Sequence, residues 1–506
     1  MSYYQPRTMH DLLQHTLQEY GALPYTYEYE DGEFRPTTYS NFIADVERTA
    51  ALLIEKGYKG ERIMLYGKNS YQWLVLYFAI TAYVGVAVCA SKDWKAYDIA
   101  NALAASRPAL VLCDDELRQY LPGDQPVLPY TELQSLTQST QAPSLVQLEQ
   151  WEQPGSDIAI IIFTTGTTSI PKGVPLSLDI LFANGSSLYR RVPSTTRDSY
   201  YLFLPMHHVY SQTCVTVAAF VVGAKLYISR DVHNFAEEAA LIRPTIIFGV
   251  PLFFERVLNA ISAEDMQRIS RATTVLNALH APTWLRRKIF KPVHAAFGGR
   301  VRLLTSGGAL LNRSTKRFLR DVGIHLIEGY GMSESSGVVA AEYRTSRDRD
   351  AVGTVLESQQ VIIHNPDEDG WGEVYVKGKC LMPGYDTPDG YDRRQFSDEG
   401  YYKSGDIGRL GKKRTLYIRG RKEKVLVLSS GENISINEMT SLLVEQEGID
   451  KVYLRDESGY LAAEIFSKLT KEALAQKIAS LNASLPRYKQ IKTYTQINDY
   501  TLSEMK

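Results

Sequence analysis

The sequence predicts an α/β protein with a large N-terminal domain, made of layered α/β subdomains and a β-rich subdomain, and a small α/β domain at the C-terminus. Three observations predict this class. Short apolar runs alternate with amphipathic segments of helical spacing, which is typical of parallel strands covered by helices. After Gly370 the pattern changes to β segments separated by turns, and a smaller α/β unit closes the 506-residue chain. We place the domain boundary near Gly420, giving domains of residues 1–419 and 420–506.

Each element is predicted from its periodicity and from the turn residues beside it. Apolar residues at helical spacing predict helices over Tyr39–Lys56, Gln72–Gly85, Asp98–Ala105, Cys214–Ala224 and Thr470–Leu481. Short apolar runs predict strands over Arg62–Tyr66, Val86–Ala90, Ala109–Cys113, Tyr201–Leu204, Lys225–Ile228, Thr245–Phe248 and Val301–Thr305. Gly372–Lys377 and Tyr417–Leu428 are predicted β segments, and residues 115–156, rich in Gln, Pro and Ser, are predicted to be a connection.

The composition is typical of a globular protein in a reducing compartment. Lys and Arg number 56 against 57 for Asp and Glu, so the charge balance favours neither nucleic acid nor an anionic membrane surface as the main partner. The four cysteines form no C-x-x-C pair and are predicted to be small buried residues. The N-terminus has no apolar signal, and no apolar run reaches the ~20 residues that span a bilayer. We therefore expect a cytoplasmic protein without a transmembrane segment.

The most informative segment is FTTGTTSIPKGV, residues 163–174, which follows a strand-like apolar run. Its hydroxyl donors are Thr164, Thr165, Thr167 and Thr168, its flexible positions are Gly166 and Gly173, and its fixed charge is Lys172. Hydroxyl groups, free backbone N–H groups and a lysine together form a cradle for phosphates. The segment is not a Walker loop, because Gly173 and not Ser or Thr follows the lysine. We predict a triphosphate-binding loop.

Five further motifs follow this loop in a fixed order. They are LPMHH (204–208), SGGA (306–309), EGYGMSE (328–334), YKSGD (402–406) and GRKEKVLVLSSGENI (420–434). Together with the loop they resemble the core motifs of the adenylate-forming enzymes, which include acyl-CoA synthetases, nonribosomal-peptide adenylation domains and luciferases. The resemblance extends from about Thr38 to the C-terminus. It implies an ATP- and Mg²⁺-dependent ligase that forms an acyl-adenylate and then a thioester, with a small C-terminal domain that rotates between the two reactions.

The resemblance also implies which residues bind the nucleotide. Lys172 and the threonine loop would hold the β- and γ-phosphates, Ser333 would reach the α-phosphate, and Glu334 would offer Mg²⁺ a hard oxygen ligand. Tyr330 would pack on adenine. The flanking Glu328, Gly329 and Gly331, and the loop of Gly307, Gly308 and Ala309, would line the same site.

Further residues are implied around the ribose, the acid and the thiol. Asp406 would accept both ribose hydroxyls, and Arg421 would support the same ribose. His208 would lie near the acyl carboxylate and gate its pocket, although His207 beside it leaves the assignment open and a buried structural histidine is the alternative. Gly431 would line a pantetheine channel. Lys506, the last residue, would be the catalytic lysine that reaches the α-phosphate and the attacking carboxylate; a terminal lysine without a role is the alternative.

The sequence departs from the family pattern at a few positions. Ser169 stands where the phosphate loop usually has Gly, which reduces backbone freedom. Glu423 occupies the hinge position, where Asp or Lys is usual. The domain from Gly420 to Lys506 is shorter than is typical of the family.

The acid is encoded less clearly than the chemistry. The segment after Pro205, MHHVYSQTCVTVAAF, has no acidic residue, which disfavours an amino acid as substrate, and Val209 stands where aryl-acid enzymes tend to have Asn. Residues 244–255 and 485–492 resemble fatty acyl-CoA synthetases, so we expect a hydrophobic acid in an apolar tunnel. The thiol acceptor is coenzyme A or the phosphopantetheine arm of an acyl carrier protein, between which the sequence does not decide.

Two alternatives remain open. One is an aryl-acid or other carboxylic-acid adenylating ligase, including one that stops at the adenylate or passes it to an amine. The other is a catalytically impaired nucleotide-binding protein, suggested by Ser169 and by the terminal position of Lys506. The joint presence of Lys172, Glu334 and Asp406 favours an enzyme.

Overall fold

The computed structural model describes residues 4–139, 143, 145–164, 172–346, 348, 350–422, 425–427, 433–457, 460–485 and 489–498. The chain forms two compact units. The first contains residues 1–360 and 376–402, and the second contains residues 361–375 and 403–506. The predicted boundary at Gly420 falls inside the second unit, and a separate domain of residues 420–506 stays a prediction.

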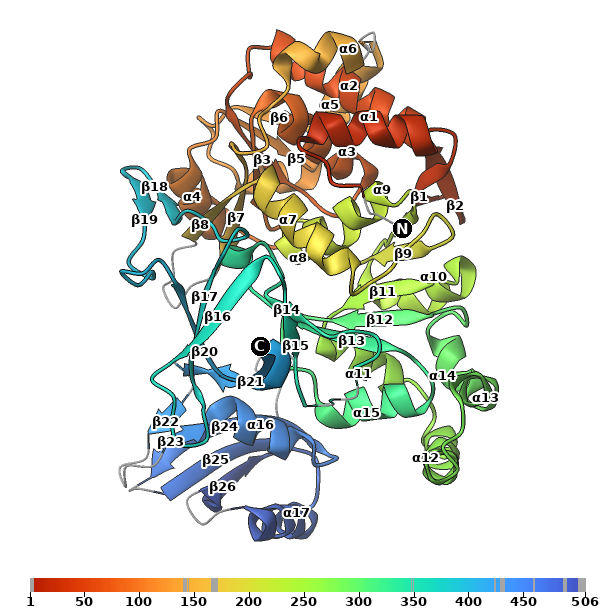
Figure 1. Cartoon of the computed structure of the whole chain (residues 1–506), viewed down its shortest axis with the longest axis vertical. Coiled ribbons are helices and arrows are strands. Elements are labelled where there is room, and N and C mark those ends of the chain that lie inside the picture. Colours follow the sequence, from red (N-terminus) through yellow and green to blue (C-terminus); the bar gives the residue numbers. More distant parts are fainter. Residues whose placement is uncertain are drawn as a thin grey trace. The chain divides into compact units, whose positions relative to one another are not determined.

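One sheet of the first unit contains, next to each other, the two strands that flank the predicted phosphate loop (Figure 1). Its strands, in spatial order, are β19 (Gly390–Asp392), β18 (Tyr385–Thr387), β8 (Lys172–Ser177), β7 (Ile158–Thr164), β4 (Val86–Ala90), β3 (Arg62–Tyr66), β5 (Leu110–Cys113) and β6 (Val127–Pro129). The strands from β7 to β6 run parallel and are almost wholly buried, which explains their continuous apolar sequences. β8 runs antiparallel to β7, so Thr164 lies opposite Lys172.

A second run of strands in the same unit carries three more of the motifs at its edge. In spatial order these strands are β15 (Gly353–Val355), β14 (Ala340–Ala341), β13 (Leu326–Tyr330), β12 (Leu303–Ser306), β11 (Ile246–Gly249), β9 (Ser199–Leu202), β10 (Lys225–Ile228), β1 (Pro24–Glu30) and β2 (Glu33–Thr38). The strands from β13 to β10 are parallel. Their carboxyl ends therefore meet at one edge, where ligands of open α/β sheets bind.

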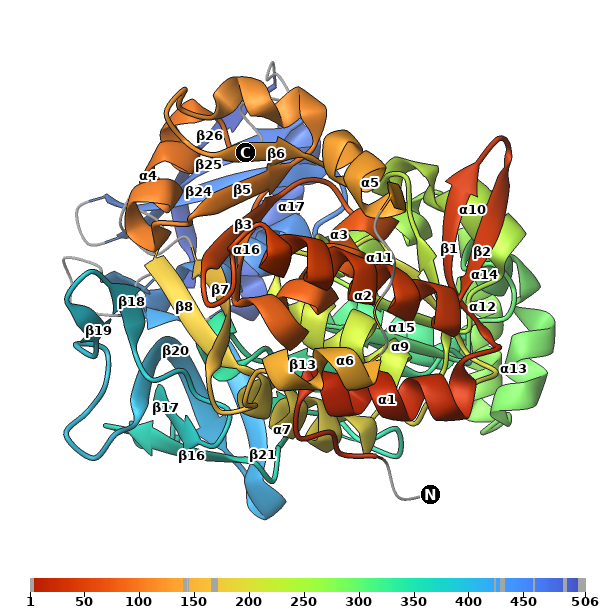
Figure 2. The ribbon, with the colours of Figure 1, turned by 90° about the horizontal axis from the view of Figure 1, so that it is seen from above.

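Helices cover these sheets, and several of them begin at positions capped by a side chain. The helices of the first unit include α1 (Met9–Tyr20), α2 (Tyr39–Glu55), α3 (Tyr71–Ala79), α4 (Ala96–Ser106), α5 (Tyr130–Ser139), α7 (Leu178–Tyr189), α10 (Phe235–Ile242), α11 (Pro251–Asn259), α12 (Ala263–Ala278), α13 (Thr283–Ile289), α14 (Lys291–Ala296) and α15 (Arg313–Asp321). The hydroxyls of Thr38, Ser70 and Ser177 each accept a backbone N–H at the start of a helix. α1 packs beside α2 (Figure 2).

Most predicted elements are confirmed to within a few residues. The β segment predicted over Tyr417–Leu428 corresponds to two strands, β21 (Thr415–Arg421) and β22 (Val425–Val427), and its residues 423, 424 and 428 lie outside the described residues. Another difference concerns the predicted connection. Residues 115–156 are not merely a connection, because they contain β6, α5 and shorter helical turns. These elements are short, and each buries at most two apolar residues, among them Leu117, Leu133 and Leu148. So few apolar positions leave no readable period. The helix predicted over Gln72–Gly85 also changes its winding, since a π-helical turn over Ile80–Val84 follows α3.

The remaining strands and two helices belong mainly to the second unit, although β16 and β20 begin, and β17 ends, with residues of the first unit. Their bounds are β16 (Gln359–His364), β17 (Gly372–Gly378), β20 (Tyr402–Leu410), β21 (Thr415–Arg421), β22 (Val425–Val427), β23 (Asn433–Ser435), α16 (Ile436–Val444), β24 (Ile449–Glu457), β25 (Tyr460–Ser467), α17 (Lys471–Ser484) and β26 (Ile491–Ile497). β24, β25 and β26 form a small sheet that packs on apolar residues of both helices, including Met439, Leu474 and Ile478. This is the predicted small α/β unit.

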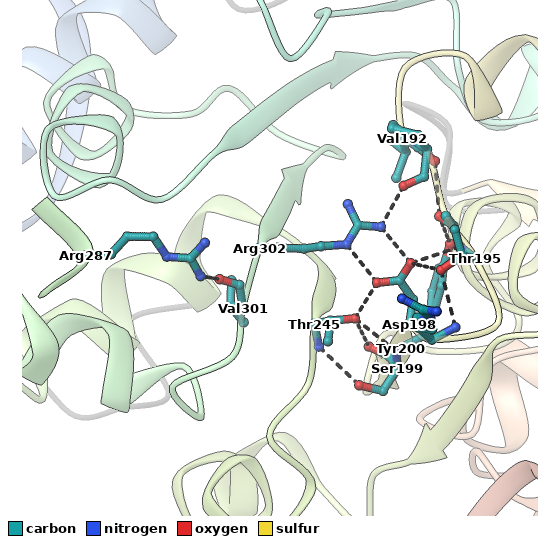
Figure 3. A network of polar contacts seen from close by, with 12 residues as sticks. Val192, Thr195, Asp198, Ser199, Tyr200, Thr245, Arg287, Val301 and Arg302 are labelled. Atoms are coloured by element: carbon teal, nitrogen blue, oxygen red, sulfur yellow. Dashed lines mark hydrogen bonds and ion pairs between the residues drawn. The ribbon is translucent and has the colours of Figure 1, made fainter. Parts of the chain in front are cut away.

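The amino ends of the parallel strands are joined by one buried ion pair (Figure 3). Asp198, before β9, accepts two hydrogen bonds from Arg302, before β12, at 2.7 and 2.8 Å. Thr245, before β11, donates to the same carboxylate at 2.8 Å. Burial would raise the pKa of Asp198, but the bonds from Arg302 and Thr245 outweigh it and lower that pKa. These bonds join the starts of β9, β11 and β12 at the amino edge of the sheet, while the motif residues follow the strands at the carboxyl edge.

Two of the composition-based expectations can be compared with the described residues. Cys89, Cys113, Cys214 and Cys380 are all buried and free, as predicted. In the described part of the chain, no helix combines the length and the apolar character needed to cross a bilayer.

A buried carboxyl on α2 makes the stability of the first unit depend on pH. Burial raises the pKa of Glu47 to about 7, against the lowering effects of Arg48 and the Leu145 amide. Because folding raises this pKa, the contribution of Glu47 to stability is fully present below the unfolded-state pKa of about 4.5. It is lost as the pH rises through the folded-state pKa of about 7. We expect Glu47→Gln to stabilise the protein by about 2 kcal/mol at pH 8 and by almost nothing at pH 4, measured by urea unfolding. A variant equally or less stable than the parent at pH 8 would contradict this.

Candidate active site

The described end of the phosphate loop places Lys172 above an aromatic ring. Lys172 begins β8, and its Nζ lies 5.1 Å from the centre of the Tyr385 ring on the neighbouring strand β18. The face of an aromatic ring attracts a cation, so the ring holds the ammonium group in place without neutralising its charge. Of the other loop residues, Thr164 ends β7 opposite Lys172. Thr165, Gly166, Thr167 and Thr168 lie outside the described residues, as do Gly431 and Lys506.

The hydroxyl of the same tyrosine fixes the predicted metal ligand. Tyr385 donates to Oε1 of the buried Glu334 at 2.6 Å, and Tyr402 donates to the same oxygen at 3.1 Å. The two hydroxyls are 2.8 Å apart. Burial, together with the Glu334 carboxylate, raises the pKa of Tyr402, so the Tyr402 phenol stays protonated and can donate. Tyr385 therefore links the predicted phosphate-binding lysine to the predicted metal-binding carboxylate.

The strand that carries Tyr385 is anchored by an ion pair with β3, a strand of the same sheet that is not its neighbour. Asp386, next to Tyr385, accepts hydrogen bonds from two nitrogens of Arg62 at 2.6 and 3.0 Å. Asp386 also lies opposite Gly173, where a Cβ would come within 3.5 Å of the aspartate. A bidentate Arg–carboxylate pair fixes direction as well as distance. Arg62 and Asp386 thus position the tyrosine.

The loop after β13 requires glycine and is held from α7. A Cβ on Gly331 would lie 2.0 Å from the carbonyl oxygen of Gly337, so no other residue fits there. The buried Asn184 donates to the carbonyls of Ser335 and Val338 at 3.0 and 2.7 Å. Between these fixed points the 3₁₀ turn Ser333–Ser335 presents Ser333 half-exposed and Glu334 buried. Tyr330, at the end of β13, and Gly329 before it lie at the same carboxyl edge.

The loop of Gly307, Gly308 and Ala309 follows the neighbouring strand β12. A Cβ on Gly307 would lie 3.3 Å from the ring of Tyr210, and Gly308 has a φ of +80°. Tyr210 is held by a hydrogen bond with Thr305 at 3.1 Å. The backbone can pass close to this ring because no side chain intervenes. The structure therefore brings the SGGA and EGYGMSE motifs to adjacent strand ends, as expected from parallel strands.

Glu328 is the one predicted nucleotide residue whose carboxylate is engaged elsewhere. Its Oε2 lies 2.7 Å from Nζ of the buried Lys316, which also lies 3.2 Å from Glu342. Glu342 in turn pairs with Arg320 at 2.8 Å. Burial raises the pKa of Glu328, and Lys316 opposes that rise. The side chain thus supports β13 from beneath, and a direct role of Glu328 in nucleotide binding stays a prediction.

The two adjacent histidines are held in their neutral forms. Their ring centres are 4.2 Å apart. Desolvation lowers the pKa of His207 to about 3, with further lowering by His208 and Lys92, and desolvation also lowers the pKa of His208. His208 is the more exposed of the two and precedes the helical turn Val209–Ser211. Neutral imidazoles at pH 7 can donate or accept hydrogen bonds without adding charge.

In the second unit, Asp406 and Arg421, which the sequence predicts to bind ribose, contact each other; ribose binding itself stays a prediction. Asp406 on β20 lies opposite Arg421 on β21, and Arg421 Nε is 2.9 Å from Asp406 Oδ1. Arg421 also donates to the Ser404 carbonyl at 3.0 Å, and the Ser404 hydroxyl accepts from the Asp406 amide at 3.1 Å. Asp406 is buried and Arg421 is exposed. The carboxylate is therefore oriented by Arg421, which the Ser404 carbonyl holds in turn, while the Ser404 hydroxyl fixes the backbone of Asp406.

The donor set at Glu334 fits a magnesium ion that is held mainly by a nucleotide. Both tyrosines donate to Oε1, and no other described residue donates to Oε2. Within the described ranges, no group of three or more His, Cys, Asp and Glu side chains gathers as a metal site. Mg²⁺ typically takes one or two carboxylates, with phosphates and water completing its shell. Glu334 suits this role, and the binding itself stays a prediction.

Comparison with known proteins agrees with this geometry. Residues 13–386 match the family model described as AMP-binding enzyme, which covers most of the chain, so the chain belongs to this family. The long-chain-fatty-acid–CoA ligase FadD15 of Mycobacterium tuberculosis is 27% identical over 444 residues, covering 80% of this chain and 72% of the relative. The fatty acyl-CoA synthetase B of Dictyostelium discoideum is 25% identical over 480 residues, covering 84% and 71%. The predicted class, an AMP-forming acid–thiol ligase, is confirmed.

Solved structures confirm the fold. ATP-bound MatB from Rhodopseudomonas palustris matches with a TM-score of 0.80 at 21% identity, covering 98% of this chain and 95% of that one. The O-succinylbenzoate coenzyme A synthetase MenE of Bacillus subtilis, in complex with AMP, matches with a TM-score of 0.78 at 18% identity, covering 98% and 95%. The predicted architecture, a large N-terminal α/β part followed by a small C-terminal one, is thereby confirmed.

Sequence reasoning missed the residues that orient the site. Tyr385, Asn184 and Arg62 act through contacts 51 to 324 residues away in sequence. Tyr402 belongs to the YKSGD motif, so its position in the sequence was recognised. Nothing in that motif predicts the hydrogen bond between Tyr402 and Glu334. Such long-range pairs carry no local pattern.

Proposed function

We propose that this protein activates a hydrophobic carboxylic acid, of the fatty-acid class, with ATP. The first reaction gives the acyl-adenylate and pyrophosphate, and the second transfers the acyl group to a pantetheine thiol and releases AMP. The observation that supports the chemistry most directly is the Tyr385 bridge, in which one side chain contacts the Lys172 ammonium with its ring and the Glu334 carboxylate with its hydroxyl. Adenylation needs positioned charge more than covalent catalysis.

Each residue has a part in this reaction. Lys172 would bind the β- and γ-phosphates, and Ser333 would donate to the α-phosphate at the start of its 3₁₀ turn. Mg²⁺, held by Glu334, would supply charge neutralisation on the phosphates. Asp406 would accept the two ribose hydroxyls, since Arg421 and the Ser404 hydroxyl already orient it. Tyr330 would stack on adenine, next to the close backbone of Gly307, Gly308 and Ala309.

The acyl pocket would lie beside the neutral histidines. His208 would contact the carboxylate, and its lowered pKa means that it would not form an ion pair that competes with the attack on the phosphate. The relatives that are long-chain fatty acyl-CoA ligases support an aliphatic acid. They also favour coenzyme A as the thiol, with an acyl carrier protein as the second source. The small domain of residues 420–506 would turn about Glu423 to bring Gly431 to the thiol.

A pyrophosphate-exchange assay tests the proposal. We expect ATP–pyrophosphate exchange that depends on a fatty acid and is weak with aryl and amino acids. Formation of AMP with coenzyme A, compared with a phosphopantetheine-loaded carrier protein, then identifies the acceptor. A preference for aryl acids would replace the substrate class. ATP binding without exchange for any acid would establish the catalytically impaired alternative.

The terminal lysine gives a separate prediction. We expect Lys506→Ala to lower acid-dependent exchange by about 100-fold or more, because a charge on the α-phosphate and the attacking carboxylate would be lost. The exposed Lys492 on β26 provides the matched control, and Lys492→Ala is expected to keep the parental rate. Both variants should unfold at the parental temperature. Parental exchange in Lys506→Ala would refute the assignment.

A further inference from the structure

One corner of the first unit is cationic, although the chain as a whole has a formal net charge of −1. From α12 to the start of α14, residues 263–291 contain six Lys and Arg against two acidic residues. α12 and α13 lie side by side at this corner in both views (Figures 1 and 2). The reaction proposed above uses none of these residues.

α12 has a buried apolar face and, next to it, an exposed line that also carries apolar side chains. Its inner face packs Ile269 and Leu276 into the core cluster of α11, α14 and α15. Its outer face carries Arg271, Val275 and Leu279 at intervals of four residues, which places them in one line along the helix. Val275 is 57% exposed and Leu279 is 71% exposed. Core packing therefore does not account for these two apolar residues.

α13 continues the same surface and is fixed against the end of α12. Arg286 donates to the Leu276 carbonyl at 2.9 Å and to Asn277 Oδ1 at 2.6 Å. Arg287 donates to the Val301 carbonyl at 2.5 Å (Figure 3). These inward bonds turn the other side of α13 outward, where Trp284 is 68% exposed and Lys288 follows it by one helical turn.

The carbonyl groups that accept these bonds do not cancel the positive charge of the arginines. Lys288 and Lys291 are exposed, and within the described ranges neither has an acidic partner. A large exposed indole beside aliphatic side chains, with cations around it, is the chemistry of a helix that lies in a membrane interface. An ordinary solvated helix does not expose Trp, Leu and Val together.

We propose that the outer face of α12 and α13, which we call the basic–apolar face, docks on a bilayer that contains anionic lipids. Val275, Leu279 and Trp284 enter the headgroup region, while Arg271, Lys288 and Lys291 contact lipid phosphates. A lipid surface accounts for both kinds of side chain, because an anionic bilayer offers phosphates to the cations and an apolar interior to Val275, Leu279 and Trp284. This inference concerns binding alone and does not depend on which acid is activated.

Co-sedimentation of the full chain with vesicles tests it. We expect binding to vesicles of phosphatidylcholine mixed with phosphatidylglycerol, weak binding to phosphatidylcholine alone, and release at high salt. Lys288→Glu combined with Lys291→Glu should weaken binding by about tenfold or more, and Leu279→Ser combined with Trp284→Ser should do the same. Equal binding to both kinds of vesicle, or none to either, would overturn the proposal.

The matched control places the same charge change elsewhere. Lys412 and Lys413 are exposed lysines of the second unit, and Lys412→Glu combined with Lys413→Glu should leave vesicle binding near the parental level. Circular dichroism should show all variants folded, because every altered side chain is exposed. A parental protein that is dimeric by light scattering, and becomes monomeric in Leu279→Ser with Trp284→Ser, would show that a second copy covers this face and would also overturn the proposal.

Discussion

Replacing Glu334 by Gln is expected to lower the rate of acid-dependent ATP–pyrophosphate exchange by about 100-fold or more, with little change in stability. Gln keeps the shape of the side chain, and its amide oxygen can still accept from the hydroxyls of Tyr385 and Tyr402. Only the charge is lost. If that charge holds Mg²⁺ against the phosphates, the variant should also need a higher Mg²⁺ concentration for half-maximal exchange, which a purely structural role would not change.

Tyr385→Phe separates the charge from its positioning. The variant keeps the Glu334 charge and the aromatic face under Lys172, but it loses the 2.6 Å hydrogen bond. We expect a loss of about tenfold in exchange and a moderate rise in the Mg²⁺ requirement, because the carboxylate would be less well oriented. Tyr385→Leu, which also removes the ring under Lys172, should cost more and should raise the KM for ATP.

The outcome that contradicts this account is easily recognised. If Glu334→Gln keeps parental exchange at every Mg²⁺ concentration, the carboxylate is not a metal ligand, and the two tyrosines serve only to satisfy a buried charge. If Tyr385→Phe is as inactive as Glu334→Gln, the hydroxyl itself contributes to the reaction. Thermal unfolding of each variant distinguishes both results from a folding defect.

Local patterns predicted the fold well because its strands are short, buried and parallel. The run Arg62–Tyr66 has the bounds of β3, and Lys225–Ile228 has those of β10. In each case a continuous apolar run ends at polar turn residues, which leaves little freedom in the assignment. The position of the motifs in the fold could also be predicted. Parallel strands bring the residues that follow them, such as Gly307, or that end them, such as Tyr330, to one edge of the sheet.

The sequence could not predict how the site is oriented. The bond between Tyr385 and Glu334, and the one between Arg62 and Asp386, join segments whose proximity depends on the complete fold. Residues 115–156 were difficult to predict for a local reason. Their short elements bury too few residues to produce a recognisable helical or strand periodicity in the sequence. The occupied carboxylate of Glu328 could not be predicted either, because its motif gives no information about Lys316 beneath it.

Lys316→Met is expected to destabilise the first unit by about 3–5 kcal/mol, the largest stability loss that we predict. The lysine side chain is 1% exposed, and its Nζ lies 2.7 Å from Glu328 and 3.2 Å from Glu342. Met fills the volume of the lysine stem but leaves two buried carboxylates without their shared cation. The Ala351 carbonyl, 2.9 Å from the same nitrogen, loses its donor as well. Urea unfolding followed by tryptophan fluorescence measures the loss.

The pH dependence of the loss identifies its cause. Burial raises the pKa of Glu328, and Lys316 opposes that rise, so the pKa should be higher still in Lys316→Met. When the pKa of a carboxyl is raised by folding, the protonated form at low pH does not destabilise the folded protein. The folded protein loses stability as the pH rises through the pKa of the folded state. The deficit of the variant should therefore be small at pH 5 and large at pH 8. A deficit that does not change with pH would point to lost packing instead.

A second substitution should restore much of the stability. Glu328→Gln in the Lys316→Met background removes one of the uncompensated charges, and the remaining carboxylate of Glu342 keeps its 2.8 Å ion pair with Arg320. The double variant should be more stable at pH 8 than Lys316→Met alone. The rate of ATP–pyrophosphate exchange in the double variant then tests whether Glu328 takes part in nucleotide binding. If exchange is retained, Glu328 acts only through the position of β13, and if exchange is lost from a stably folded protein, its carboxylate is needed by the nucleotide.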